Sequence, residues 1–257
     1  DKTLGKATMK TGPAVAEEYF ALSELLENNI RLARNLSDPA RTAPDKQELA
    51  HTILGSKLSE PALAGVLELA AGRWSSELDL QEACRLLANH VLLKTAQDNG
   101  QLEDVERDIF AMSQVVAKNR DLRNFLTDNH RAPLDQRLET FNSLVGSGVK
   151  PLALRLVNAV IAKAAPGRLA SDLRALLDSA ARMRQRGMAT VYTATPLSET
   201  QRSRLIQLLS ARSGEQVEVN VVIDPNLVGG IKIVQGDTVM DGAVKSRAEQ
   251  FRRKLAS

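Results

Sequence analysis

The sequence predicts a mainly α-helical chain that ends in a small α+β domain. Apolar residues recur at three- and four-residue steps from residue 14 to about 186, which is the period of amphipathic helices. After Gly187 the pattern changes to alternation, which is typical of strands. The helical half also resembles itself at a fixed shift, which predicts two tandem bundles. We therefore expect an extra helical module over residues 1–84, a helical bundle over 85–186 and a small α/β domain over 187–257.

The helical half contains several clear amphipathic stripes. One stripe repeats every three or four residues from Leu102 to Val116, and acidic residues occupy its first turn, where the helix dipole favours them. Pro151 suits the first turn of a later helix, because proline lacks an N–H that would be unpaired there. A further stripe runs from Leu169 to Met183. Short loops between such helices predict a bundle.

The last 70 residues predict the order strand, helix, two or three strands, helix. Met188 to Ala194 is rich in β-formers, and the residues from Val217 to Ile223 alternate. Between them, Ser198 and Gln201 are spaced as a capping box, and Gly214 suits the end of the helix. Gly229-Gly230 opens a further strand, and Asp241 is the expected N-cap of a final helix with apolar positions Val244, Ala248, Phe251 and Leu255.

A comparison of the helical half with itself gives eleven identities over residues 20–61 at an ungapped shift of 90 residues. The pairs include Phe20 with Phe110, Asp45 with Asp135, Leu54 with Leu144 and Pro61 with Pro151. We interpret the match as an internal duplication in which both copies share or abut one long helix near residues 80–98. Chance agreement between two leucine-rich helical stretches is the alternative.

Composition and motifs argue against catalysis and against nucleic-acid binding. The net charge is +3, its excess lies in the last predicted helix, and only eight aromatic residues are available to stack on bases. No phosphate loop, dinucleotide fingerprint or metal motif is present, and the three histidines lie about 40 residues apart. Cys84 is the sole cysteine, which we expect to be a buried structural thiol. No cofactor, metal or catalytic residue is predicted, and no apolar run has the length of a membrane span.

The C-terminal residues carry a family resemblance. The run from Asp224 to Ile233 with its Gly229-Gly230 pair, followed by Gly236-Asp237, Asp241-Gly242 and Lys245-Ser246-Arg247, resembles the signature of the delta subunit of F-type ATP synthases, which is related to the mitochondrial oligomycin-sensitivity protein. Ala243 and Phe251 depart mildly from it. The resemblance covers residues 85–257. The seven motif residues are expected to be structural: Gly229, Gly230, Gly236, Asp237, Asp241, Gly242 and Arg247.

The resemblance implies a non-catalytic connector in the peripheral stalk, or stator, on the cytoplasmic face of the cell membrane. In that family the helical domain binds the N-terminal helices of the alpha subunits, and the C-terminal domain binds the b (stalk) helices. The extra helical module resembles the actinobacterial branch, where the subunit can be fused behind a membrane-anchored helix. Apolar anchors for a docked helix are expected at Leu86, Val91, Leu173 and Leu177, for which core packing is the alternative role. The alternative function is a nucleic-acid-binding α/β module that uses the basic last helix.

Overall fold

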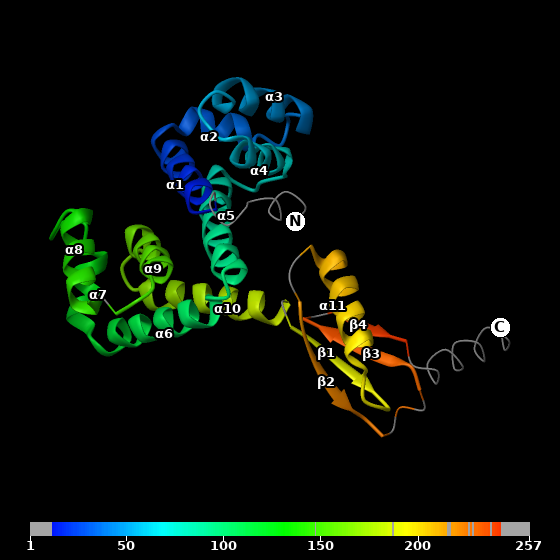
Figure 1. The fold of residues 1–257 in the computed structure, drawn as a ribbon. Helices are drawn as coiled ribbons and strands as arrows, with labels where there is room; N and C mark the ends of the chain where they lie inside the picture. The colour runs from blue at the N-terminus through cyan, green and yellow to red at the C-terminus, as the bar shows by residue number, and fades with distance from the viewer. Residues whose placement is uncertain are drawn as a thin grey trace, which may run out of the picture. The chain divides into compact units, whose positions relative to one another are not determined.

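A computed structural model describes residues 12–146, 148–186, 188–214, 217–225, 227, 229–236 and 238–242. The chain divides into two compact units, Asp1–Ala180 and Ala181–Ser257. The described part confirms a mainly helical chain with a small C-terminal sheet (Figure 1).

Helices account for the first unit, and the last of them, α10, continues past Ala180 into the first residues of the second unit. Their bounds are α1 Gly12–Asn28, α2 Ile30–Ser37, α3 Ala43–Leu54, α4 Glu60–Ala71, α5 Glu77–Asp98, α6 Leu102–Lys118, α7 Arg120–Thr127, α8 Leu134–Val145, α9 Pro151–Lys163 and α10 Leu169–Arg186. The stripe predicted from Leu102 to Val116 is the buried face of α6, and Pro151 lies in the first turn of α9, as expected.

Helix α5 is the long helix that the sequence predicted near residues 80–98. It packs against α1, α2 and α4 on the N-terminal side of the chain and against α6 and α9 on the C-terminal side. Because both groups of helices use it, α5 buries residues around much of its circumference, from Leu80 and Cys84 to Leu92 and Leu93. The two bundles therefore share one central helix.

The helix bounds repeat along the chain with small changes of offset. Helices α6 and α7 begin and end 90 residues after α1 and α2. Helix α8 begins and ends 91 residues after α3, and α10 begins 92 residues after α5. The order of the helices thus recurs, and the lengths of the first four pairs agree to within one residue, which supports the internal duplication.

The buried residues of the two copies do not align at a single offset of 90 residues. Lys46 and Ala50 in α3 are buried, and their counterparts Arg137 and Phe141 in α8 are buried 91 residues later. In α9 all four buried residues, Ala153, Leu156, Val157 and Ile161, lie 91 residues after those of α4. The pairs Asp45–Asp135, Leu54–Leu144 and Pro61–Pro151 are therefore wrong by one residue. A one-residue slip turns a helix by about 100°, so only the 91-residue offset keeps the same face inward.

Polar contacts around the α2–α3 and α7–α8 turns also recur. The backbone N–H of Ala40 donates to Asp38 at 2.8 Å, and that of His130 donates to Asp128 at 2.9 Å. The hydroxyl groups of Ser37 and Thr127 each donate to the carbonyl four residues before them. The offset between the two copies is therefore 90 residues up to the turn that follows α2 and α7. The one additional residue of the second copy lies between this turn and α8.

Ion pairs connect α1 of the first bundle to α9 of the second. The guanidinium of Arg155 donates two hydrogen bonds to the Glu17 carboxylate, at 2.6 and 2.7 Å, and lies 4.2 Å from the centroid of the Phe20 ring. One end of α9 is held in the same way, by an ion pair between Lys163 and Glu27. The paired acids and Phe20 lie on one side of α1, which is therefore a helix-binding face.

The second unit contains a four-stranded sheet in the order β2-β1-β3-β4. Its elements are β1 Met188–Thr193, α11 Glu199–Ser213, β2 Glu218–Ile223, β3 Ile231–Gln235 and β4 Thr238–Asp241. Strands β1 and β2 are parallel and joined through α11, whereas β3 pairs antiparallel with both β1 and β4. Ala189, Val191, Val219 and Ile233 on one face of the sheet form a core with Leu209 of α11.

Local signals in this unit are confirmed at α11. Ser198 and Gln201 form the capping box, and Gly214 closes the helix at a φ of 73°. Asp241 is the last residue of β4 and lies opposite Lys232, and its expected role as an N-cap stays a prediction. Strand pairing takes up its backbone there. The predicted final helix, with Val244, Ala248, Phe251 and Leu255, lies outside the described residues.

Candidate docking sites

The glycines of the C-terminal motif adopt backbone conformations that other residues rarely take. Gly229 and Gly230 have φ values of 135° and 82° just before β3, and Gly236 has a φ of 55° in the turn between β3 and β4. Positive φ is costly for residues that carry a Cβ, and most of all for β-branched ones. These three glycines therefore shape the entry to β3 and its hairpin.

The remaining motif residues also belong to strand pairing where they are described. The backbone N–H of Gly242 donates to the carbonyl of Ile231 at 2.9 Å, and a Cβ at Gly242 would lie 3.1 Å from that oxygen. Asp237 and Arg247 lie outside the described residues. The described part of the motif builds the sheet and brings no reactive groups together.

The four predicted apolar anchors do not gather on one exposed surface. Leu86 is 55% exposed and Leu177 is half-buried, but Val91 and Leu173 are core residues at 3% and 0% exposure. Val91 is enclosed because α5 is packed between two bundles. Neither Val91 nor Leu173 can contact a partner in this packing, so the core role holds for these two.

Three large apolar side chains lie exposed on α5 and the neighbouring helix α2. Leu78 and Leu86 are 65% and 55% exposed, and Ile30 of α2 is 43% exposed. Leu78 and Ile30 line a groove of about 590 Å³ together with Gln81, Arg85 and Lys163 and the acids Glu27, Asp79 and Glu82. Burial lowers the pKa of Arg85, which pairs with Glu82. We name Ile30, Leu78 and Leu86 the α5 stripe.

Sequence reasoning found only Leu86 of this stripe. Leu78 is out of phase with the buried positions Leu80 and Cys84, whereas Ile30 is in phase with the buried Ala33 and Ser37 and is exposed as the first residue of α2. An apolar residue that does not fit the buried phase of its own helix is the available signal. It becomes readable only when the helix bounds are known.

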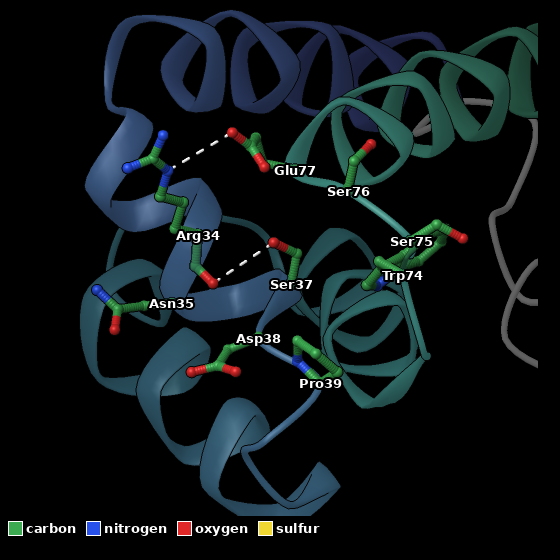
Figure 2. Close-up of a pocket in the computed structure, with 9 residues that line it drawn as sticks. All are labelled: Arg34, Asn35, Ser37, Asp38, Pro39, Trp74, Ser75, Ser76 and Glu77. Atoms are coloured by element: carbon green, nitrogen blue, oxygen red, sulfur yellow. Dashed lines mark hydrogen bonds and ion pairs between the residues drawn. The ribbon is translucent and has the colours of Figure 1, made fainter.

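A second pocket, of about 320 Å³, lies where α2 ends and α5 begins (Figure 2). Figure 2 shows Arg34 reaching toward Glu77, with a separation of 3.5 Å, and the Ser37 hydroxyl turned back to the carbonyl of Arg34. Trp74 on the rim donates from its indole N–H to the carbonyl of Leu69 at 2.8 Å. These contacts are internal, so the pocket is a junction between α2 and α5.

Reactive chemistry is not assembled in the described ranges. They contain no group of three or more His, Cys, Asp or Glu side chains that could hold a metal ion. His51 is exposed on α3, and His130 is exposed in the turn between α7 and α8. Burial raises the pKa of Tyr19 to about 12, and its hydroxyl donates to the carbonyl of Pro61 at 3.3 Å. Nor do the described residues include a helix long and apolar enough to span a bilayer.

Cys84 should be inert to thiol reagents in the native protein. It is 1% exposed, and burial raises its pKa to about 12, so both access and thiolate formation are suppressed at pH 8. We expect no reaction with an aromatic disulfide reagent at pH 8 until denaturant unfolds α5, and then one thiol per chain. Rapid labelling of the folded chain would contradict its burial. A Cys84→Ala chain provides the blank.

Comparison with known proteins points to one family. Residues 90–255 match the family described as ATP synthase delta (OSCP) subunit. The ATP synthase subunit delta of Streptomyces avermitilis is 37% identical over 243 residues, which is 95% of this chain and 89% of that protein. The subunit delta of Salinispora arenicola is 35% identical over 243 residues, covering 95% of this chain and 88% of that protein.

These matches also bear on the extra helical module. Because the alignment with the Streptomyces avermitilis protein leaves out only a twentieth of this chain, most of the segment before residue 90 is present in that relative. A chain from the Toxoplasma gondii mitochondrial ATP synthase hexamer is a more distant likeness, with a TM-score of 0.34, 20% identity and coverage of 66% of this chain and 95% of that one. The nucleic-acid-binding alternative receives no support from these comparisons.

Proposed function

The chain belongs to the ATP synthase delta (OSCP) subunit family, and on that basis we propose that it connects the catalytic head to the peripheral stalk. It is a non-catalytic stator subunit of the F-type ATP synthase. The observation that carries the proposal is the match over nearly the whole chain, together with the division into a helical unit and a sheet unit. Two separately folded units suit a connector, because each can bind a different partner.

The helical unit is the proposed binding site for the N-terminal helices of the alpha subunits. An amphipathic helix binds through apolar anchors that fit a groove. The α5 stripe offers three exposed anchors, of which Ile30 and Leu78 line a groove of about 590 Å³. Of the anchors expected from the sequence, Leu86 belongs to this stripe and Leu177 is half-buried on α10.

The sheet unit is the proposed binding site for the b (stalk) helices. The glycine motif supports this role by shaping β3 and its hairpin. The membrane is reached only indirectly, through the assembled complex, and we propose a peripheral location on the cytoplasmic face of the cell membrane. The extra module is proposed to comprise residues 1–84, with α5 shared between the two bundles. It would stiffen the connector or provide a second binding site for the head or the stalk.

Head binding should depend on the α5 stripe. We expect Leu86→Glu to weaken binding of the full chain to a purified catalytic head about tenfold or more, because a charge would be buried among apolar contacts. Leu144→Glu on α8 is the matched control, since Leu144 is 61% exposed and lies outside the stripe. Binding can be measured by biolayer interferometry.

Salt dependence separates apolar docking from an electrostatic mode. Apolar docking should change little between about 0.05 and about 0.5 M salt, whereas charge-driven association weakens steeply. Equal head affinity for Leu86→Glu and the parent chain would remove the stripe from the interface. Failure of the parent chain to bind the head would remove the connector function itself. Substitutions are preferable to deleting residues 1–80, because α1 packs along α5 and its removal would expose core residues.

A further inference from the structure

The two bundles differ in how far equivalent apolar side chains of α1 and α6 are exposed. Phe20 in α1 and Phe110 in α6 occupy the same position of the repeat, 90 residues apart. Phe20 is half-buried beneath the Arg155 guanidinium of α9, whereas Phe110 is 54% exposed. Val115, the counterpart of the half-buried Leu25, is likewise 44% exposed. The helix-binding face of α1 thus has an uncovered copy on α6.

The charges on the two faces differ in sign. In α1, Glu17 and Glu27 hold the cations Arg155 and Lys163 of α9. At the corresponding positions α6 has Arg107 and Ala117, and Lys118 lies exposed one residue further on. The same side of α6 also carries two acids, the exposed Glu103 and the half-buried Asp104, and Asp104 is paired with Arg107 and Lys150. Together with Lys118, the three cations exceed the two acids by one, so α6 lacks the acidic character of the α1 face. A helix with carboxylates suits α6.

Arg107 already has a partner, Asp104 on its own helix. Asp104 also forms an ion pair with a second cation, because Lys150 lies 3.5 Å from its other carboxylate oxygen. Arg107 can therefore turn to an incoming carboxylate without leaving Asp104 unpaired. The side chains of both Arg107 and Lys150 are well exposed, so this exchange requires no repacking of the core.

We propose that the α6 face formed by Arg107, Phe110, Val115 and Lys118 binds an acidic amphipathic helix of another subunit, as α1 binds α9. The inference rests on the proposed function for the identity of the assembly, and it adds a docking surface separate from the α5 stripe. The partner helix places an apolar side chain on Phe110 and a carboxylate opposite Arg107. Exposed aromatic and arginine side chains are the residue types that dominate binding energy at interfaces.

The test is site-specific photo-crosslinking in the assembled ATP synthase. A benzophenone amino acid at position 110 should cross-link to a helical segment of another subunit that has Asp or Glu within one turn of the linked residue. The same probe at exposed position 144 controls for random capture, and a probe at position 20 should link internally to α9. Linked peptides are identified by mass spectrometry.

Two substitutions test the chemistry. Phe110→Asp should weaken binding of the chain to the partner identified by cross-linking about tenfold or more, with an unchanged circular dichroism spectrum. Arg107→Glu should weaken it more at low than at high salt. Linkage to a second copy of this chain, to a basic segment, or at no higher yield than position 144 would each overturn the proposal. The connector function is judged separately, by whether the parent chain co-purifies with the complex.

Discussion

Gly65→Leu is expected to lower the free energy of unfolding of the helical unit by about 3 kcal/mol. Gly65 is buried in α4, and a Cβ added there would collide with the hydroxyl of Tyr19 and lie 3.1 Å from its Cζ atom. Tyr19 is 2% exposed and cannot swing into solvent without leaving a cavity. The clash must therefore be relieved by moving α1 away from α4.

The second bundle indicates how the clash can be repaired. The counterparts of Tyr19 and Gly65 are Ile109 and Leu156, which are both fully buried. A large residue on one helix is thus paired with a small one on the other in the first bundle, and two medium residues fill the same space in the second. Tyr19→Ile alone should cost about 2–4 kcal/mol by leaving a cavity and breaking the hydrogen bond to Pro61.

The double variant Tyr19→Ile, Gly65→Leu should recover most of the stability, with a coupling energy of roughly 3 kcal/mol. Urea unfolding can be followed through Trp74, the sole tryptophan, which packs beside α4. Glu68→Leu, at an exposed position of α4, controls for the helix propensity of leucine. Additive effects of the two substitutions would show that the bundles do not share a core arrangement.

Gly230→Val is expected to destabilise the sheet unit by about 1–3 kcal/mol. Gly230 has a φ of 82° immediately before β3, and a β-branched residue is strongly disfavoured there. Strand β3 lies between β1 and β4, so a distorted entry weakens pairing on both sides. Binding to the stalk should fall with the folded fraction, and binding to the head should be kept.

Hydrogen exchange resolves the effect by unit. In the Gly230→Val chain, peptides from β1 and β3 should exchange faster, while peptides from α5 and α6 stay unchanged as an internal control. Gly230→Asn is the matched variant and should be milder, because asparagine adopts positive φ more readily than valine. An unchanged exchange pattern in β3, with unchanged stalk binding, would show that the positive φ is not needed.

Local signals were sufficient for much of the fold, because periodicity and capping act within a few residues. The buried stripe of α6 and the capping box at Ser198 were readable from the sequence and are confirmed. The strand predicted from Val217 is present, but its buried alternation ends at Val221, and Ile223 is 53% exposed. The repeat was readable as well, although its offset rises from 90 to 91 and 92 residues between successive helices. Counting identical residues at one fixed shift does not show where a turn contains an additional residue. The burial pattern shows it, because each additional residue rotates the buried face of the next helix by about 100°.

The family, the helical and sheet halves and the repeated helix order can be read from the amino-acid sequence, since these depend on motifs and local patterns. Which apolar residues reach the surface depends on how the helices pack against one another. Val91 and Leu173 are buried because other helices pack over them, while Leu78 and Phe110 are exposed on helices whose other faces form the core. Exposure depends on neighbours distant in the chain. The uncovered Phe110, beside its covered counterpart Phe20, is therefore a property of the packing and not of either helix alone.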